Sequence, residues 1–261
     1  MPNFSYEKKM WAKDYYVIGI DEVGRGALSG PMVIGAVCFA FREKLRTPAS
    51  EDKSVTTPYY TIETKIDKLE GEPLVNRMVR KYAFAPFFKS EAKINIVENI
   101  GIDDSKRLTA KKREKLAKDI KDLSLVHTTV HISNSVIDRI GLTKSSRIGV
   151  KKAISSLLKK CNYLNYANIF VLIDGLDMRY LHNIGLKNQR AIIKGDQKSI
   201  SIAAASILAK VERDRNMVKL HQKYPIYNWQ QNKGYGTKEH LSAIKKFGKS
   251  KFHRLLFLRK L

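Results

Sequence analysis

The chain has 261 residues, enough for one sizeable hydrophobic core or for a core domain with an appendage. Hydrophobic residues make up 43% of it, which excludes a chain that is disordered throughout. Lys and Arg number 49 against 25 Asp and Glu, and the net charge of +24 indicates a polyanionic partner, either nucleic acid or an acidic membrane surface.

The basic surplus is unevenly placed along the chain. Residues 1–41 carry 4 basic and 4 acidic side chains, whereas residues 104–188 carry 17 against 7 and residues 189–261 carry 17 against 4. Lys and Arg alternate there with apolar residues, which favours a folded basic face over a charged tail. Cys38 and Cys161 lie far apart in apolar surroundings, and we interpret both as buried thiols in a reducing compartment.

Strand-like and helix-like segments alternate, which predicts an α/β fold. Residues 16–20 and 32–41 are apolar, rich in β-branched side chains and broken by glycines, as expected of two buried strands. Residues 42–102 are charged, contain three prolines and indicate a surface excursion. The remaining predicted elements are helices over 109–123 and 144–160, strands over 125–132 and 168–174, and a long helix over 199–224. In the second of these helices we expect an inward face of Ile148, Ile154, Leu157 and Leu158.

Acidic residues stand where these elements end. Asp21 and Glu22 close the first strand, Asp174 closes the strand of residues 168–174, and Asp196 precedes the long helix. The carboxyl ends of strands are where α/β folds build their sites, so the four side chains could converge. Carboxylates cannot cluster in a cleft without a counter-charge, and oxygen ligands suit Mg²⁺ or Mn²⁺. A basic protein with such a cleft has what phosphodiester hydrolysis by two ions needs.

Each acid also has an interpretation without a metal. Asp21 and Glu22 could be solvated turn residues, Asp174 a turn residue before Gly175, and Asp196 a helix-entry residue favoured by the helix dipole. The joint pattern in a strongly basic chain favours the metal cleft, but it names no reaction.

Five blocks in order resemble the ribonuclease HII family, the type 2 ribonucleases H. They are "GIDEVGRGALSGPMVIGAV" at 19–37, "DDSKRLTAKKREKL" at 103–116, "VLIDG" at 171–175, "IIKGDQKSISIAAASILAKVERDRNM" at 192–217 and "NKGYGTKEHL" at 232–241. The resemblance implies a ribonuclease H-like mixed five-stranded sheet flanked by helices, in a catalytic domain over residues 1–220. A helical substrate-binding region over residues 221–261 would follow.

The resemblance also implies an activity. Members are metal-dependent endonucleases that cleave the RNA of RNA/DNA hybrids, and they cut 5′ to single ribonucleotides in duplex DNA, leaving 3′-hydroxyl and 5′-phosphate ends. We therefore expect a role in ribonucleotide excision and DNA replication or repair. We further expect Mg²⁺ or Mn²⁺ as cofactor, hybrid or ribonucleotide-containing duplex as partner, no membrane, a cytoplasmic location and a monomer.

The family's site residues transfer to matching positions. Its metal-binding and catalytic carboxylates fall on Asp21, Glu22, Asp174 and Asp196. Its turn that reads the RNA-to-DNA junction falls on Gly24, Arg25 and Gly26, where glycines let the backbone approach a sugar-phosphate closely. Its junction tyrosine falls on Tyr235, and a phosphate-contacting lysine on Lys106.

Several further residues have two possible roles. Tyr235 could be an ordinary loop aromatic, and Asp104 and Ser105 could be turn or cap residues. His253 and Arg254 match the family's C-terminal pair but could equally be a surface phosphate contact. For Ala203 to Ser206 we favour close helix packing over chemistry.

The chain departs from the family in two places. The connection over residues 42–102 is longer than the family's usual one, and Leu256 stands where a serine is usual. Within the enzyme class, ribonuclease HIII is the alternative, but it typically has a lysine where this chain has Arg25. A catalytically inactive nucleic-acid-binding domain and a membrane-surface protein are further alternatives, and retention of all four acids argues against the first of these.

Overall fold

The computed structural model describes residues 1–39, 90–161, 164–175, 181 and 183–259. Most of the long connection predicted over residues 42–102 therefore lies outside the described residues. Its last part forms helix α3, Ser90–Asn99. The expected division of the chain after residue 220 stays a prediction, because helix α7 (Ile200–Lys223) runs without a break across that position.

A mixed five-stranded sheet forms the centre of the protein, with the strand order β3-β2-β1-β4-β5. Strand β2 is antiparallel to both of its neighbours, β3 and β1, and β4 and β5 run parallel to β1. The strands are β1 Tyr16–Val23, β2 Met32–Phe39, β3 Val126–Ile132, β4 Ile169–Asp174 and β5 Gln189–Ile192. The predicted α/β class with a mixed sheet is confirmed.

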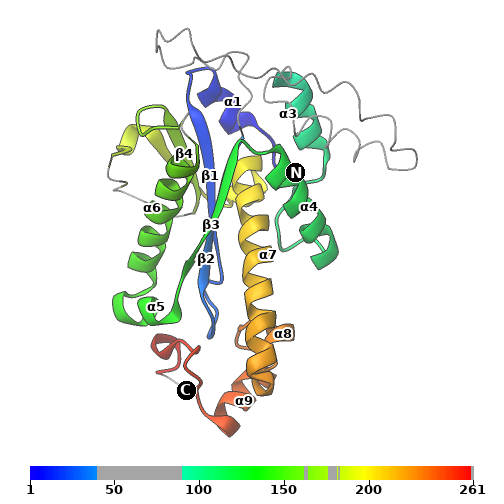
Figure 1. Cartoon of the computed structure of the whole chain (residues 1–261), viewed down its shortest axis with the longest axis vertical. Helices are drawn as coiled ribbons and strands as arrows, with labels where there is room; N and C mark the ends of the chain where they lie inside the picture. The colour runs from blue at the N-terminus through cyan, green and yellow to red at the C-terminus, as the bar shows by residue number, and fades with distance from the viewer. Residues whose placement is uncertain (40–89, 162–163, 176–180, 182, 260–261) are drawn as a thin grey trace, which may run out of the picture.

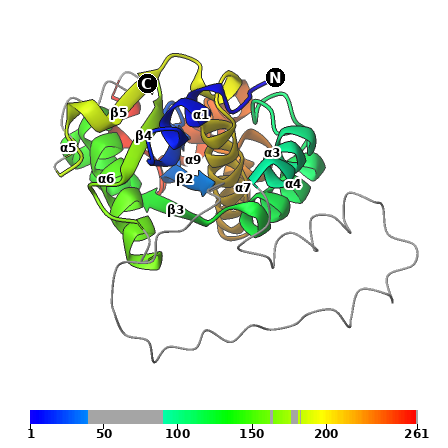
Figure 2. The ribbon, with the colours of Figure 1, turned by 90° about the horizontal axis from the view of Figure 1, so that it is seen from above.

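Helices cover both faces of the sheet (Figures 1 and 2). On one face lie α5 (Asn134–Ile140) and α6 (Leu142–Lys160), whose apolar residues join a core with the inward side of β1 and β2. On the other face lie α7 and α1 (Ser5–Trp11), with α4 (Ala110–Leu123) packed against α7. Apolar area buried in both layers provides most of the stabilisation, because hydrophobic burial is the dominant favourable contribution to folding.

The small-residue start of α7 lets this helix lie directly on the central strands. A Cβ atom at Gly19 would come within 2.1 Å of the Ser201 carbonyl carbon, and one at Gly35 within 2.1 Å of the Ala205 carbonyl oxygen. Residues 203–205 are fully buried alanines. The predicted close packing of this segment is therefore confirmed, since any side chain on either glycine would push the helix off the sheet.

The C-terminal region consists of short helices gathered around Trp229. They are η3 Pro225–Tyr227, α8 Trp229–Asn232, α9 Lys238–Phe247 and η4 Leu255–Phe257. The described chain also contains two short 3₁₀ helices nearer the sheet, η1 Leu186–Asn188 and η2 Gly195–Gln197. Trp229 is fully buried and packs with Met217 of α7, so the region is fastened to the end of that long helix (Figure 1).

The predicted strands and helices are present, but β1 runs on to Val23, so Asp21 and Glu22 lie inside the strand and do not close it. Elements α1, α5 and β5 were not predicted. One side chain of α6 also differs from its expected place. Ile154 and Leu157 face the core as predicted, but Ile148 is 38% exposed, so its inward assignment was wrong. Both cysteines, Cys38 and Cys161, are free and buried, as expected. None of the described helices has the length and apolar character that crossing a membrane requires.

Candidate active site

Two neighbouring parallel strands bring Asp21 and Asp174 together. Ile20 of β1 is paired with Ile173 of β4, so the next residue on each strand is an acid. Asp21 is buried and Asp174 is half-buried. The two acids were singled out because each follows an apolar run, and the structure confirms that they lie close together. They do so because parallel strands end at the same edge of a sheet.

Asp196 is delivered to the same place by a tight turn. Lys194 adopts a left-handed backbone conformation, and the Gly195 N–H donates a hydrogen bond of 2.6 Å to Oδ1 of Asp174. A Cβ atom on Gly195 would lie 2.6 Å from Cδ1 of Ile202 on α7, so glycine is the residue that fits there. Asp196 follows immediately in η2 and is 3% exposed.

The three aspartates form one carboxylate group. One carboxylate oxygen each from Asp21, Asp174 and Asp196 lies within 4.8 Å of the other two. These residues are far apart in the sequence, and their convergence comes from the sheet and the turn described above. The donor set consists of hard oxygen atoms only, which is the set that Mg²⁺ and Mn²⁺ prefer.

The electrostatics of this group leave it short of positive charge. Burial raises the pKa of Asp21 to about 7, and repulsion from Asp174 and Asp196 adds to the rise, while hydrogen bonds from Ser206 and the Glu22 N–H reduce it. Burial likewise raises the pKa of Asp174. A bound cation would reverse both effects by favouring the ionised carboxylates.

Lys106 supplies the nearest positive charge to the group. Its Nζ lies 3.4 Å from Oδ2 of Asp196, and its side chain is 77% exposed. The preceding turn is shaped by Asp104, which accepts hydrogen bonds from the Lys106 N–H and from Nε2 of Gln197. The turn role considered for Asp104 is therefore the one that the contacts support, and it places Lys106 at the pocket.

Glu22 stands apart from the three aspartates. Alternation along β1 turns its side chain away from that of Asp21, towards α6, where the Arg25 Nη1 donates to Oε1 of Glu22 and, at 3.3 Å, to Oγ of Ser146. The other carboxylate oxygen, Oε2, is buried and has no hydrogen-bond partner among the residues that the structure describes. A buried acceptor without a donor is costly, and a cation would satisfy it. The assignment of Glu22 as a metal ligand stays a prediction.

The turn at Gly24, Arg25 and Gly26 follows β1 directly. Gly24 has φ +87°, and a Cβ atom there would lie 2.0 Å from Nε of Arg213. Both the backbone conformation and the close approach require glycine. Gly26 has open space where its Cβ would be, which leaves room for a ligand.

Tyr235 lies beside this turn although it comes from the C-terminal region. Tyr235 is 37% exposed, and the guanidinium carbon of Arg213 lies 5.2 Å from the centroid of its ring. The backbone N–H groups of Leu28 and Ser29 both donate to the Gly234 carbonyl oxygen. The segment that follows the turn is therefore joined through the backbone to residues 233–236, the tyrosine loop.

Two buried arginines hold the same segments. Arg213 donates to the carbonyl oxygens of Ser29, Pro31 and Lys233, and Arg254 donates to those of Gly30 and Arg25. Both side chains are fully buried.

The interpretation of His253 and Arg254 as a surface phosphate contact was wrong. His253 is 1% exposed and Arg254 is 0% exposed, so neither can meet a phosphate at the surface. Burial lowers the pKa of Arg254 to about 10, and its hydrogen bonds to carbonyl groups offset part of the cost of enclosing the charge. Its role is to hold the turn in place.

One pocket of about 630 Å³ unites these parts. It is lined by Asp21, Glu22, Val23, Gly24, Arg25, Gly26, Ser105, Lys106, Arg113, Asp174, Ser206, Lys210 and Tyr235. Of the predicted site residues only Asp196 is absent from this lining, and it lies behind Asp174 and Lys106 at the distances given above.

Five lining residues were not predicted as site residues, and all of them except Val23 are polar or charged. Ser206 hydrogen-bonds to Ser105 and supports Asp21, whereas Lys210 and Arg113 both pair with Asp214. The sequence contained the information needed to predict two of them. Ser206 and Lys210 are four residues apart on α7 and therefore share a face of that helix.

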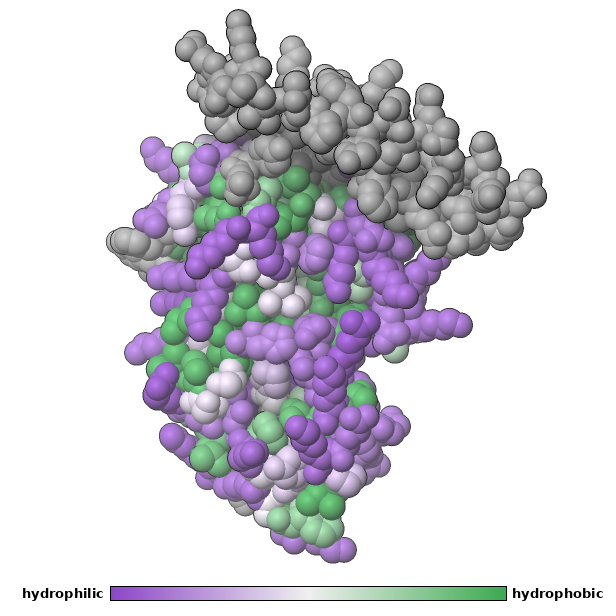
Figure 3. Space-filling view, in the orientation of Figure 1, coloured by the Kyte–Doolittle hydropathy of each residue, from purple (hydrophilic) through white to green (hydrophobic). Residues whose placement is uncertain are grey.

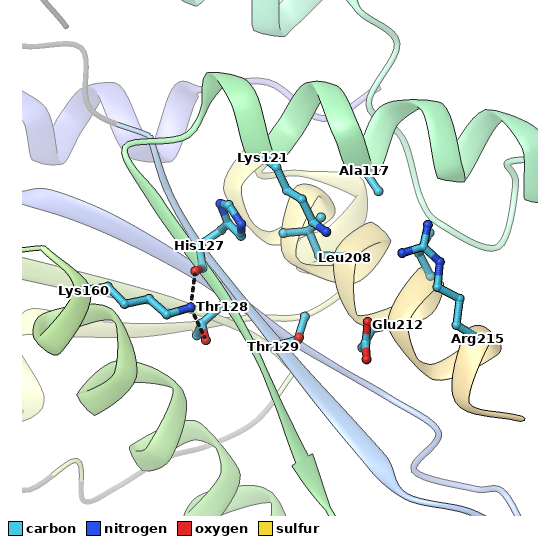
Figure 4. Close-up of a pocket in the computed structure, with 10 residues that line it drawn as sticks. Ala117, Lys121, His127, Thr128, Thr129, Lys160, Leu208, Glu212 and Arg215 are labelled. Atoms are coloured by element: carbon cyan, nitrogen blue, oxygen red, sulfur yellow. Dashed lines mark hydrogen bonds between the residues drawn. The ribbon is translucent and has the colours of Figure 1, made fainter. Parts of the chain in front are cut away.

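A second, smaller pocket of about 180 Å³ lies on the opposite face of α7 (Figure 4). Lys121, Lys160 and Arg215 point towards it together with Glu212, and Nζ of Lys160 donates to the His127 carbonyl oxygen and to Oγ1 of Thr128. Hydrophilic side chains cover much of the described part of the face seen in Figure 3. Cationic side chains are therefore not confined to the carboxylate pocket, since three of them also line this second one.

Comparison with known proteins identifies a family. The sequence model described as Ribonuclease HII matches residues 82–260. The ribonuclease HII of Caldicellulosiruptor bescii is 35% identical over 257 residues, which cover 98% of this chain and 93% of that protein. The ribonuclease HII of Clostridioides difficile is 34% identical, covering 97% of this chain and 74% of that protein.

Solved structures support the same fold. The ribonuclease H2 of Pyrococcus horikoshii OT3 matches with a TM-score of 0.60 and 24% identity, covering 92% of each chain. Bst-RNase HIII in complex with Mn²⁺ matches with a TM-score of 0.61 and 17% identity, covering 94% of this chain and 67% of that one. The predicted ribonuclease H-like architecture is thereby confirmed.

Proposed function

This chain belongs to the ribonuclease HII family of type 2 ribonuclease H endonucleases, which act on RNA/DNA hybrids, and from that premise we propose its substrates and mechanism. It cleaves the RNA strand of hybrids and cuts 5′ to single ribonucleotides in duplex DNA, leaving 3′-hydroxyl and 5′-phosphate ends. Its role is ribonucleotide excision during DNA replication and repair. The observation that carries the proposal is the single pocket shared by the carboxylates, the turn at residues 24–26 and Tyr235.

The carboxylates are proposed to hold Mg²⁺ or Mn²⁺. Asp21, Asp174 and Asp196 are the holding residues, and Glu22 joins them through its unpartnered oxygen. A pair of such ions supplies an activated water and stabilisation of the leaving oxygen. The raised pKa values of Asp21 and Asp174 support this assignment, because they indicate a group that lacks a counter-charge. The Mn²⁺ complex of Bst-RNase HIII is a precedent on the same fold.

The remaining pocket residues orient the nucleic acid. Lys106 has an exposed ammonium beside the carboxylates, from which it can contact a phosphate oxygen of the cleaved strand. Gly24 and Gly26 bring backbone groups within reach of a ribose, whose 2′-hydroxyl both donates and accepts hydrogen bonds. The exposed ring of Tyr235 packs against the following deoxyribose, where a second 2′-hydroxyl would crowd it.

Mapping the cut tests the proposal. The protein is incubated with duplex DNA that contains one ribonucleotide, with Mg²⁺ or Mn²⁺, and the ends are sequenced. Cleavage on the 5′ side of the ribonucleotide, leaving a 3′-hydroxyl, is expected. Cleavage of long hybrids without any cut at the single ribonucleotide would instead favour the ribonuclease HIII type of activity. An uncut duplex and an uncut hybrid would overturn the proposal.

A further inference from the structure

A pair of buried histidines lies directly behind the tyrosine loop. His240 of α9 is 0% exposed and His253 is 1% exposed, and their Nε2 atoms are 3.2 Å apart. Tyr227 and Trp229 enclose them, with Tyr227 4.6 Å from the ring centroid of His253. Neither histidine lines the carboxylate pocket, and the mechanism above uses neither.

The hydrogen bonds determine which nitrogen of His240 carries the proton. Trp229 Nε1–H can only donate, and it lies 3.0 Å from Nε2 of His240. Nε2 must therefore be the acceptor of a neutral imidazole, which puts the proton on Nδ1. Nδ1 lies 2.8 Å from the Tyr235 carbonyl oxygen and donates to it.

His253 supports the same tautomer. The Ser250 backbone N–H donates to Nδ1 of His253 at 2.9 Å, so the proton of this ring is on Nε2. It is directed at Nε2 of His240 and shares the one lone pair of that atom with the Trp229 N–H. Oγ of Ser29, three residues beyond the turn at residues 24–26, lies 3.3 Å from the same His240 atom. His240 thus contacts three segments at once, through Ser29 after the turn, Tyr235 in the tyrosine loop and His253 near the C-terminus.

The surroundings keep the pair uncharged. Burial lowers the pKa of His240, and burial together with His240 lowers that of His253 to about 4. Neither ring has a carboxylate among its hydrogen-bonding partners in the described residues. A second proton on His240 would face the Trp229 N–H, so the neutral form is the one the geometry accepts.

We propose that His240 is a positioning residue for recognition of the RNA-to-DNA junction: its Nδ1–H fixes the Tyr235 carbonyl, and Trp229 and His253 hold the imidazole in the required tautomer. The inference rests on the proposed function, in which the Tyr235 ring meets the deoxyribose after the ribonucleotide. Loss of this bond lets the ring move relative to the turn while leaving the three aspartates in place. Selectivity for single ribonucleotides then falls more than cleavage of long hybrids.

Two substitutions at one position separate positioning from packing. In His240→Asn the side-chain amide N–H takes the place of Nδ1–H and can still donate to the Tyr235 carbonyl. In His240→Gln the amide reaches the place of Nε2, so it can accept from Trp229 but leaves the carbonyl without a donor. His131→Gln is the matched control, because His131 pairs with Glu212 on the opposite face of α7.

The readout is the ratio of kcat/KM on a single-ribonucleotide duplex to kcat/KM on a long hybrid, with the thermal midpoint recorded for every variant. His240→Gln is expected to lower the ratio about tenfold, because small displacements of a positioning group are costly. His240→Asn is expected to keep it within about threefold of the unmodified protein, and His131→Gln to leave it unchanged. If both His240 variants lower stability alike and leave the ratio unchanged, His240 has a packing role only and the inference is wrong.

Tyr235→Ala, measured in the same assay, distinguishes failure of the inference from failure of the proposed function. If Tyr235→Ala leaves the ratio unchanged, junction reading by the tyrosine is wrong. If it lowers the ratio and His240→Gln does not, the positioning role alone is wrong. Should His240→Gln not fold, His240→Ala makes the same test, because it also removes the Nδ1–H that donates to the Tyr235 carbonyl. A ratio unchanged in a folded His240→Ala protein would count against the inference.

Discussion

At the carboxylate end of the pocket, Asp21, Asp174 and Asp196 crowd negative charge into a largely buried space with Lys106 as the nearest cation. At the tyrosine end, by contrast, Tyr235 and the turn are held by donors and acceptors that are matched within the protein. The first region lacks a matching positive charge among the described residues. The second is complete before any ligand arrives.

Because of this difference, the two regions should respond to different perturbations. Metal, pH and charge-removing substitutions should act on the carboxylate end, because its energetics are dominated by desolvation and repulsion. Substitutions that remove a matched hydrogen bond should act on the tyrosine end, because a buried group left without its partner costs more than the bond contributes.

The largest effect is expected from Asp21→Asn. Removing this carboxylate should lower the cleavage rate by about 10³-fold or more, because electrostatic stabilisation of the reacting phosphate depends on the held cation. Binding to an RNA/DNA hybrid should stay within about twofold, since the basic surface that contacts the backbone is unchanged. Cleavage assays and fluorescence anisotropy measure the two quantities. Asp122→Asn on the surface of α4 is the control, and undiminished turnover by Asp21→Asn would contradict the metal assignment.

Salt should weaken binding to the nucleic-acid backbone and leave the hydrogen bonds inside the protein largely unchanged. With a net charge of +24, the affinity for a hybrid should fall at least about 100-fold between 50 and 200 mM salt, because each neutralised phosphate releases counterions. The thermal midpoint of the free protein should change little over the same range, since the tyrosine end is held by buried hydrogen bonds. An affinity that does not vary with salt would show that the basic faces are not the docking surface.

Metal binding should strengthen as pH rises. Because the pKa of Asp21 is raised to about 7, a proton must leave before this carboxylate can serve a cation. The affinity for Mg²⁺ or Mn²⁺ should be about tenfold weaker at pH 6 than at pH 8. Calorimetry in two buffers of different ionisation enthalpy would detect the released proton. Equal affinities at the two pH values, without proton release, would argue against Asp21 as a ligand.

The smallest effect is expected at the tyrosine end, from acid. The pKa of His253 is lowered from 6.5 to about 4, so between these values the unfolded chain binds more protons than the folded one. Stability should therefore fall as pH drops through this window, by about 1 kcal/mol or roughly 2–4 °C in Tm for each pH unit. Thermal unfolding of the unmodified protein and of His253→Gln between pH 4 and 7 isolates this contribution. If the stability of both proteins depends on pH in the same way, His253 does not contribute to the pH dependence.

Much of the site follows from local patterns. Apolar runs followed by an acid predicted β1 and β4 and the positions of Asp21 and Asp174, because a strand buried on both faces has a continuous run of apolar residues. The alanines before Ser206 predicted close packing of α7, which the contacts at Gly19 and Gly35 confirm. The resemblance to the family added the turn and Tyr235.

Other parts depended on distant segments meeting. His253 and Arg254 look like surface residues in sequence, since charged and polar side chains are mostly exposed. Arg254 can be buried because Gly30 and Arg25 present carbonyl acceptors from more than two hundred residues earlier in the chain. His253 can be buried because His240 and Ser250 supply its hydrogen-bond partners. Ile148 was misplaced for a related reason, because helical periodicity does not say how wide a face the sheet covers.

By itself the sequence determined the order of strands and helices, the acids at the strand ends and the surplus of positive charge. These are local properties of composition and period. Only the tertiary structure decided that the three aspartates converge while Glu22 turns to Arg25, and that a neutral imidazole rather than an ion pair supports the tyrosine loop. Those outcomes depend on which donors and acceptors share a buried space, and such matching arises only when residues from distant parts of the chain are packed together.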